Sequence, residues 1–503
     1  MPQSSIRVNQ VPVECEGKLS DLRKKENMNI NKKNQCMNIL VIVLAFLLGG
    51  CQKGDTNDAE EPDIEKPGEN IHIYKAPLYW SVYEYCWTQE KQGVSNENMD
   101  ITEAEWDKII DWVARDLKPY GYDMICTDGF IPMIADDASG YMTRYGSMDL
   151  KKLVAKCKAK GLKLGIYDNP LWLHGPDNTV VKGTNVTFGD LRYKNGDKVA
   201  HPGKNDLWFG WAVASHEGAK EYIDGFFKHF SEMGVNYIRM DFLSWYENGE
   251  DRGMGIVGRG YGRDVYKQAL QYICESAKKY GVFTSLVMPH LFESAALEKE
   301  YGNMVRIVAD TGDGGWGQFS ENSRGKIYGT WPNSMNMFDG FIHWSKISGR
   351  EKVILDGDFI RLNTFSTDEE KESVISLQLM AGGPVTVADQ YNTIGTNLKF
   401  YQNKELLALN TDKFAGKPLS SSIIDTKNQV WYGQMSNGDW VIGFFNRESS
   451  AQSRSVNFAD LGIKGKMKVR DLWKHADEGE AERLNVSLKA HACKMVRLTK
   501  PVN

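Results

Sequence analysis

Cysteine and histidine, which supply most protein metal sites and all disulfide frameworks, are scarce in this sequence. The 503 residues include eight cysteines and nine histidines, and only five of those cysteines lie beyond residue 51. An odd number of cysteines cannot all pair within one chain, and no two of the five have the spacing of zinc ligands. We therefore expect neither a disulfide scaffold nor a bound metal.

The sequence also lacks a net positive charge and a phosphate-binding motif. The net charge is -5, so no basic face is expected to attract nucleic acid. The glycine-rich stretch at residues 253–262 lacks the Lys-Ser/Thr pair of a P-loop and has no strand directly before it. We interpret it as a mobile or substrate-lining loop, and we expect no nucleic-acid partner and no cofactor.

An apolar run near the start, at residues 39–48, is too short to span a bilayer. It follows two lysines and ends in Leu48-Gly-Gly-Cys51, an order typical of a secretory signal. The ending resembles the lipoprotein box of bacteria, which implies cleavage before Cys51 and acylation of its thiol. A buried hydrophobic helix is the alternative interpretation of this run.

These features separate the first part of the chain from the rest. Residues 1–51 are predicted to be a leader and lipoprotein signal. We interpret the residues before Met28 as the product of an upstream start rather than part of the working protein, and N-terminal sequencing of the native protein tests this interpretation. Residues 52–72 are acidic and contain no aromatic residue, which is typical of a solvated linker. We expect an exported protein, lipid-anchored to the bacterial outer membrane on its periplasmic or cell-surface face.

Strand-like and helix-like segments alternate between residues 73 and 410. Eight runs rich in β-branched and aromatic residues cover 78–82, 122–128, 162–168, 237–242, 283–288, 305–310, 353–358 and 385–389. Amphipathic segments lie between them, at 103–117, 151–160, 219–233 and 265–279. Eight such units predict a (β/α)8 TIM barrel. An open doubly wound sheet is the alternative, but its glycine-rich turn after the first strand is absent.

Aspartates recur at the ends of the predicted strands. They are Asp128, Asp168, Asp241, Asp310, Asp358 and Asp389. The carboxyl ends of barrel strands open onto the active site, so we expect these side chains to converge on one mouth. Convergent carboxylates without histidine or cysteine favour glycosyl chemistry. A magnesium or calcium site and capping of the following helices are the alternatives.

The run from Val235 to Leu243 concentrates this chemistry. Arg239 and Asp241 interrupt an otherwise apolar strand, where an ionised carboxylate carries a desolvation cost. We interpret Asp241 as a candidate nucleophile that Arg239 keeps ionised. The alternative is a purely structural ion pair between the two side chains.

Seven short motifs appear in a recognisable order. They are Trp80 followed by Tyr83-Glu84, Gly121-Tyr-Asp-Met-Ile-Cys-Thr-Asp128, Leu164-Gly-Ile-Tyr167, Tyr237-Ile-Arg-Met-Asp241, Arg306-Ile-Val-Ala-Asp310, Asp356-Gly-Asp358 and Gln402-Asn-Lys-Glu-Leu-Leu-Ala-Leu-Asn410. This order resembles the α-galactosidase (melibiase) family, glycoside hydrolase family 27 of clan D. The resemblance runs from about Pro77 to the C-terminus.

The resemblance implies catalytic roles for two aspartates. Asp241 matches the family's nucleophile and Asp310 its general acid/base, with Arg306 of the same motif binding a sugar hydroxyl and steering ionisation. The nearby Asp313 is a rival for the acid. Sugar hydroxyls are implied to bind at Asp128, Tyr167, Arg239 and Asp358, beside an apolar wall of Trp80 and Tyr83.

Several positions depart from the family pattern. Where α-galactosidases carry two adjacent aspartates that contact the 4- and 6-hydroxyls, this chain has Asp128 followed by Gly129. Arg239 replaces a lysine, and Val287-Met288-Pro289 stands where a glutamate follows the fifth strand. The segment at residues 172–211 is longer than expected. These differences indicate that the sugar need not be a plain terminal galactose.

Short alternating runs and turn signals replace the barrel pattern after residue 410. They predict an antiparallel β-sandwich over residues 411–503, and the stretch Asp439-Trp-Val-Ile-Gly-Phe-Phe-Asn446 resembles the C-terminal β-domain of the same family. Packing against the barrel is the expected role of this domain, with carbohydrate binding as the alternative.

Together these features predict a retaining exo-glycoside hydrolase whose partner is an oligosaccharide or polysaccharide. The expected substrate is a terminal α-D-galactosyl or related residue. The alternatives are β-L-arabinopyranosidase, α-N-acetylgalactosaminidase, α-glucan or other clan-D specificity. A non-catalytic glycan-binding surface lipoprotein is the alternative from a different class.

Overall fold

The computed structural model describes residues 74–136, 138–192, 210–349 and 352–501. The predicted leader, Cys51 and the acidic linker lie outside these residues. Among the helices that are described, none combines the length and apolar character needed to cross a membrane.

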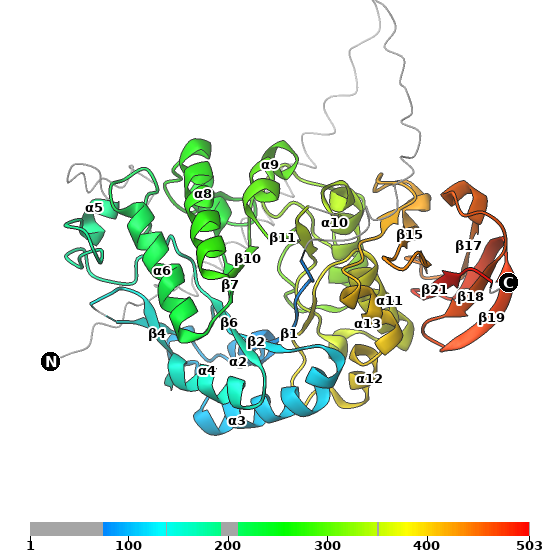
Figure 1. Cartoon of the computed structure of the whole chain (residues 1–503), viewed down its shortest axis with the longest axis horizontal. Helices are drawn as coiled ribbons and strands as arrows, with labels where there is room; N and C mark the ends of the chain where they lie inside the picture. Colours follow the sequence, from blue (N-terminus) through cyan, green and yellow to red (C-terminus); the bar gives the residue numbers. More distant parts are fainter. Residues whose placement is uncertain (1–73, 137, 193–209, 350–351, 502–503) are drawn as a thin grey trace, which may run out of the picture. The chain divides into compact units, whose positions relative to one another are not determined.

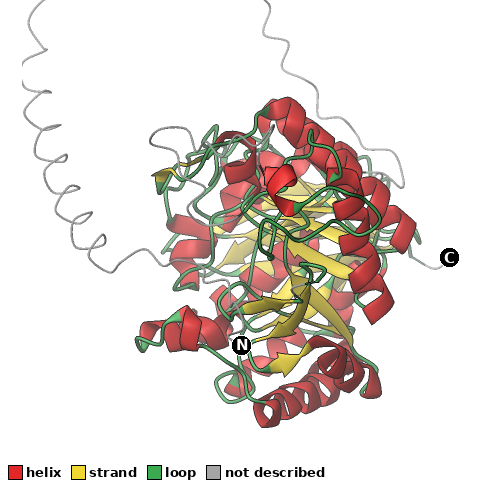
Figure 2. Ribbon diagram, turned by 90° about the vertical axis from the view of Figure 1, so that its left-hand side faces the viewer, coloured by secondary structure: helices red, strands yellow, loops and turns green. Residues whose placement is uncertain are grey.

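Eight parallel strands form one sheet in the order β12-β11-β10-β7-β6-β2-β1-β13. Their bounds are β1 (Leu78–Ser81), β2 (Met124–Cys126), β6 (Lys163–Tyr167), β7 (Tyr237–Met240), β10 (Phe283–Leu286), β11 (Met304–Arg306), β12 (Ile354–Asp356) and β13 (Val385–Val387). The two edges meet through a parallel bridge between Ile360, just after β12, and Val387. The predicted barrel and all eight of its strands are confirmed, and Figure 2 shows the strands surrounded by helices.

Helices of the barrel follow the strands, and five of them begin at a side chain that caps the first turn. Their bounds are α2 (Tyr83–Lys91), α3 (Glu103–Trp112), α4 (Leu150–Ala159), α6 (Ala219–Met233), α7 (Leu243–Asn248), α8 (Arg263–Tyr280), α9 (Phe292–Tyr301), α10 (Met337–Trp344), α11 (Asp368–Met380), α12 (Leu398–Tyr401) and α13 (Lys404–Thr411). The Thr102 side chain caps α3 and that of Asp149 caps α4, each accepting from a backbone amide of the first turn. Gly234 ends α6 with φ 99°, a conformation that favours glycine.

Two apolar layers result from the alternation of side chains along each strand. Tyr79, Met124 and Tyr237 belong to the cluster inside the barrel. Trp80 and Ile125, one position along, belong to the cluster between the sheet and its helices. The direction of a side chain on a strand therefore decides whether it can reach the site.

Two small sheets were not foreseen from the sequence. One is formed by β3 (Met133–Ala135), β4 (Met142–Tyr145) and β5 (Met148–Asp149), which lie between β2 and α4. The other is the hairpin of β8 (Glu250–Asp251) and β9 (Gly255–Ile256), at the start of the glycine-rich loop. A short helix, α5 (Phe188–Arg192), lies in the long segment after β6.

The predicted C-terminal β-sandwich is confirmed (Figure 1). Six antiparallel strands form one sheet, namely β14 (Lys417–Pro418), β15 (Val430–Gln434), β16 (Trp440–Phe445), β18 (Met467–Asp471), β19 (Ala476–Ala481) and β21 (Cys493–Thr499). The strands β17 (Gln452–Asn457) and β20 (Arg483–Leu488) form the second. Ile442, Phe444 and Val486 are part of the apolar cluster that both sheets bury, whereas Trp431 and Met495 belong to the cluster of the barrel.

Candidate active site

Strand register brings most of the predicted residues to one end of the barrel. Tyr167, the last residue of β6, pairs with Arg239 of β7, and Arg306, the last residue of β11, pairs with Asp356 of β12. Asp241 follows directly after β7. Because all eight strands are parallel, these side chains meet at the carboxyl ends of the sheet.

Asp241 is oriented by three hydrogen bonds. Its Oδ2 accepts from the Tyr167 hydroxyl at 2.9 Å and its Oδ1 from the Phe242 amide at 2.7 Å. Its backbone carbonyl accepts from Asn169 Nδ2 at 2.7 Å. Burial raises the pKa of Asp241 to about 6, and Arg239 opposes the shift. A carboxyl group with this pKa is mostly ionised at neutral pH and so able to act as a nucleophile.

Asp310 is the open carboxylate of the site, with 69% of its side chain exposed. Arg306 Nη2 donates to Asp310 Oδ1 at 2.9 Å and to Asp358 Oδ2 at 2.6 Å. Desolvation by the protein around the mouth raises the pKa of Asp310, and the negative charge of Asp358 raises it further. Arg306 opposes the shift. Asp310 in turn raises the pKa of Asp241. The two carboxylates thus lie within electrostatic range of each other.

Asp313, the rival acid, has a different set of neighbours. Its Oδ1 accepts from Trp87 Nε1 at 3.3 Å and lies 3.6 Å from Lys91 Nζ. Its side chain is 82% exposed. These contacts involve α2 and solvent rather than Arg306, so the geometry favours Asp310 as the acid.

Arg239 lies against the end of β12 rather than against Asp241. Its Nη1 is 3.7 Å from Asp356 Oδ2 and its Nη2 is 3.6 Å from Asp358 Oδ1. The guanidinium also lies over the Phe359 ring, 4.6 Å from its centroid, a favourable cation–π position. Its effect on Asp241 is therefore exerted through space, and the alternative of a structural Arg239–Asp241 ion pair is not what the structure shows.

Asp128 lies beside the glycine that breaks the family pattern. Its Oδ1 accepts from the Gly129 amide at 2.7 Å, and burial raises the pKa of Asp128 to about 7. A Cβ atom on Gly129 would lie 2.7 Å from the Tyr167 ring. Since Tyr167 also holds Asp241, a second acidic side chain at position 129 has no room unless that contact is disturbed.

The two residues of the predicted apolar wall lie on different sides of the sheet. Tyr83 reaches the mouth, where its ring packs 4.6 Å from that of Phe359 and its hydroxyl accepts from the Gly312 amide at 3.0 Å. Trp80 is fully buried on the outer side of β1 and donates to the Asp389 carbonyl at 2.9 Å. The predicted substrate contact of Trp80 is wrong, because Tyr79 takes the inward position on this strand.

Two of the six aspartates form hydrogen bonds that support the fold. Asp389 accepts from the Tyr401 hydroxyl at 2.6 Å and from two backbone amides at the start of a short helical turn. Asp168 Oδ1 accepts from the Asn169 amide at 2.7 Å and contacts His174 at 2.9 Å. Asp389 is thus held by a turn that precedes it and not by the following helix that the capping alternative named, whereas Asp128, Asp241, Asp310 and Asp358 belong to the site.

Three supporting residues were missed at the level of sequence. Asn169 holds the Asp241 carbonyl, and Asp356 faces Arg239. Thr311 donates to Asp358 through both its amide (2.6 Å) and its hydroxyl (2.7 Å). Each is adjacent to a predicted residue or within a quoted motif, but its own role depends on contacts between strands.

The cluster keeps unused hydrogen-bonding capacity. Atoms with no hydrogen-bond partner among the described residues are Asp128 Oδ2, Asp356 Oδ2, Asp358 Oδ1, Nε and Nη1 of Arg239, and Nε and Nη1 of Arg306. Buried polar atoms normally have partners, so a ligand rich in hydroxyl groups fits this set of donors and acceptors. The described residues contain no group of three or more histidines, cysteines or acids arranged to hold a metal ion.

Comparison with known proteins identifies relatives of both parts of the chain. Residues 425–498 match the alpha galactosidase C-terminal beta sandwich domain. An isomalto-dextranase of Arthrobacter globiformis is 38% identical over 443 residues, which are 84% of this chain and 67% of that protein. An α-galactosidase of Oryza sativa subsp. japonica is 26% identical over 56% of this chain and 61% of its own.

A solved structure shows the same similarity in three dimensions. The Arthrobacter globiformis T6 isomalto-dextranase complexed with panose superposes with a TM-score of 0.77 at 35% identity, covering 87% of this chain and 75% of that one. The chain therefore belongs to the α-galactosidase (melibiase) family, glycoside hydrolase family 27 of clan D, and is a glycoside hydrolase that acts on glycans.

Proposed function

We propose that this hydrolase cleaves an α-glucan of the dextran type by double displacement. Asp241 is the nucleophile and Asp310 the general acid/base. The observation that carries the proposal is the paired environment of the two carboxylates, one held by hydrogen bonds at the end of β7, the other open beside Arg306 with a raised pKa.

The proposed reaction has two balanced steps. In the first, Asp241 attacks the anomeric carbon, the glycosidic bond breaks, and the leaving oxygen takes the proton of Asp310. In the second, water attacks the glycosyl ester, Asp310 takes a proton from that water, and Asp241 is released. Arg306 and Arg239, whose Nε and Nη1 atoms have no hydrogen-bond partner among the described residues, donate to the sugar hydroxyls during both steps.

The choice of glucan over galactoside follows from the end of β2. A galactosyl unit would find only Asp128 there, because the Tyr167 ring fills the space beside Gly129. The relative that is 38% identical is an isomalto-dextranase, and the similar structure holds panose. The first expectation from the sequence, a terminal α-D-galactosyl residue, is therefore kept as the second candidate, supported by the α-galactosidase relatives.

A substrate panel tests this choice. We expect the protein to release small glucose oligosaccharides from dextran and to show kcat/KM values for nitrophenyl α-galactoside, β-L-arabinopyranoside and α-N-acetylgalactosaminide that are lower by roughly a hundredfold or more. Product chromatography and release of nitrophenol are the measurements. Faster turnover of the α-galactoside than of dextran would reverse the order of the two candidates, and binding of glycans without turnover would support the non-catalytic alternative.

The pH dependence of activity tests the role of Tyr167. Asp241 must be ionised to attack, so kcat/KM is expected to rise as the pH passes about 6 and to fall at higher pH as Asp310 loses its proton. Tyr167→Phe removes a hydrogen bond that stabilises the ionised form of Asp241. The pKa of Asp241 therefore increases, and the acid limb of the pH profile moves to higher pH by about one unit.

The matched control is Tyr222→Phe, which removes a buried hydroxyl that donates to the Trp172 carbonyl instead of a carboxylate. We expect its acid limb to stay where it is. An acid limb that does not move in Tyr167→Phe, or moves to lower pH, would contradict the assignment of that limb to Asp241.

Export and lipid attachment at Cys51 remain our proposal from the sequence pattern. Mass spectrometry of the mature N-terminus, from the native host, tests both. An unmodified Cys51 within an uncleaved N-terminal segment would contradict them.

A further inference from the structure

The backbone just before Asp310 is held on both sides by buried groups. The Ala309 amide donates to the Ser334 carbonyl at 2.9 Å, and the Ala309 carbonyl accepts from Gln318 Nε2 at 3.0 Å. Gln318 is 5% exposed and Ser334 is fully buried. Asp310 itself is open to the mouth, so its position depends on these backbone contacts as well as on Arg306.

Gln318 lies in the short helical turn Gly317–Glu321, and an arginine of the C-terminal β-sandwich anchors this turn. Arg447 follows β16, is 2% exposed, and donates from Nε to Ser320 Oγ at 2.9 Å. Its Nη2 also donates to the Ser320 carbonyl. The sandwich thus reaches the segment that carries Gln318.

The other side of Arg447 is fixed to the barrel. Its Nη1 donates to Asp339 Oδ1 at 2.6 Å, and its guanidinium lies 4.6 Å from the centroid of the Phe338 ring. Asp339 Oδ2 accepts from Asn336 Nδ2 at 2.9 Å and from the Gly325 amide at 2.7 Å. Charge-assisted bonds of this kind are strong and directional, so the arginine has a defined position.

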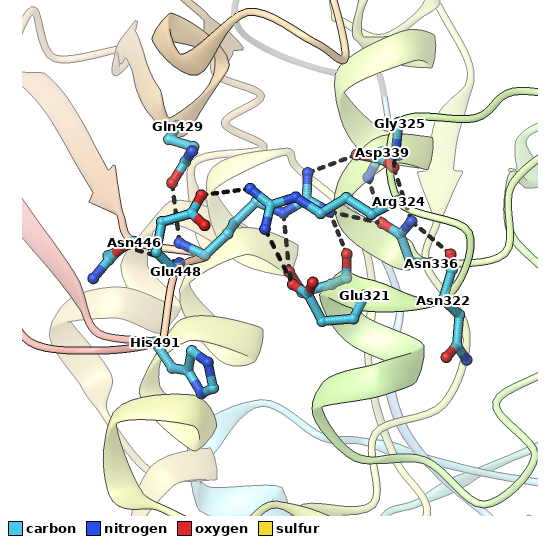
Figure 3. Close-up of polar contacts among 12 residues, drawn as sticks. Glu321, Asn322, Arg324, Gly325, Asn336, Asp339, Gln429, Asn446, Glu448 and His491 are labelled. Carbon is cyan, nitrogen blue, oxygen red and sulfur yellow. Dashed lines mark hydrogen bonds and ion pairs between the residues drawn. The ribbon is translucent and has the colours of Figure 1, made fainter. Parts of the chain in front are cut away.

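Figure 3 shows the polar contacts at this boundary, with Glu321, Asn336 and Asp339 from the barrel and Gln429, Asn446 and Glu448 from the sandwich. A second ion pair crosses the same boundary at the end of the turn, where Arg324 Nη1 also lies 3.4 Å from Glu321 Oε1. Arg324 Nη2 donates to Glu448 Oε1 at 2.6 Å, and both side chains are about one third exposed. The control is a pair away from the turn, in which Arg470 of β18 donates to both oxygens of Glu405 of α13 at 2.7 and 2.8 Å.

We propose that the C-terminal β-sandwich positions the general acid/base of this enzyme. Arg447 holds the turn Gly317–Glu321, Gln318 of that turn holds the Ala309 carbonyl, and Asp310 is thereby kept beside Arg306. Gln318 and Arg447 are positioning residues, since neither lies against the reacting atoms. The inference rests on the proposed function, because it takes Asp310 to be the proton donor.

The test separates protonation of the leaving group from the rest of the reaction. In the full chain, Gln318→Met removes the donor to the Ala309 carbonyl and puts an apolar side chain of similar size in its place. We expect kcat on the best glycan of the substrate panel to fall by about tenfold or more, because small misplacements of a catalytic group are costly. The first step on the corresponding α-glycosyl fluoride, measured as the pre-steady-state release of fluoride, is expected to change less than about threefold, because that leaving group needs little protonation.

Arg447→Lys keeps the charge opposite Asp339 but loses the forked contact with Ser320, and it is expected to give the same pattern more weakly. Arg470→Lys is expected to leave both rates unchanged. If Arg447→Lys does not fold, Gln318→Met decides alone. Equal losses on glycan and fluoride, or no loss on either, would overturn the inference.

Asp310→Ala on the same two substrates distinguishes this inference from the proposed function. If Asp310→Ala shows the dependence on leaving group and Gln318→Met does not, only the positioning role fails. If Asp310→Ala does not show it, the assignment of the acid/base fails, and the inference fails with it.

Discussion

Replacement of Asp241 by asparagine is expected to lower kcat on glycan substrates by roughly ten-thousand-fold or more. The amide keeps the shape of the side chain and its hydrogen bond with the Phe242 amide but cannot form the glycosyl ester. The side chain is 9% exposed, so this near-isosteric change is preferred to alanine, which would leave a cavity beside Tyr167. Steady-state rates, together with glycan affinity measured by calorimetry, test the expectation.

If Asp241 is the nucleophile, the Asp241→Asn variant keeps its affinity for glycans but loses turnover. Thermal unfolding provides the control, and the variant is expected to unfold within a few degrees of the parent because no cavity forms. A variant that turns over within about tenfold of the parent would remove Asp241 from the mechanism. If the parent binds glycans without measurable turnover, the non-catalytic alternative holds instead.

Replacement of Asp310 by alanine is expected to have an effect that depends on the leaving group. On a glycan, loss of protonation lowers kcat by roughly a thousandfold, within the range for general acid catalysis. On the α-glycosyl fluoride the first step is little affected, and the glycosyl ester on Asp241 accumulates because no base activates water. Added azide then restores turnover and yields a glycosyl azide with the configuration of the substrate.

Asp313→Ala is the matched control for this experiment. Asp313 is close in sequence and 82% exposed, and it pairs with Lys91, so its removal is expected to change kcat less than about threefold. Azide rescue in Asp313→Ala but not in Asp310→Ala would exchange the two roles. The product configuration also tests retention, since an inverting enzyme would give no azide product of this kind.

The positions of the catalytic pair were within reach of the sequence because the relevant signals are local. Asp241 and Asp310 each follow a short β-rich run within a recognisable motif, and parallel strands necessarily bring such positions to one end of a barrel. Arg306 lies four residues before Asp310, and the two side chains form an ion pair at 2.9 Å. The C-terminal sandwich was predictable for a similar reason, since period-two runs and turns describe its strands.

Other assignments depended on which face of a strand points inward, and the motifs did not contain that information. Trp80 and Tyr79 are neighbours on β1, and only closure of the sheet places Tyr79 inside and Trp80 outside. Asp389 had the same sequence signal as Asp358, yet Tyr401, from a later helix, and two distant amides occupy its oxygens. Local propensity cannot distinguish a carboxylate held by structure from one offered to a ligand.

By itself, the sequence determined the barrel with its following sandwich, the family, and the two aspartates expected to carry the chemistry, because hydrophobic period and motif order act over a few residues at a time. Only the tertiary structure decided that Tyr167 fills the space beside Gly129, that Asp310 rather than Asp313 faces Arg306, and that Arg447 reaches Ser320 across 127 positions of the chain. Those outcomes are contacts between elements far apart in sequence, and packing in three dimensions decides them.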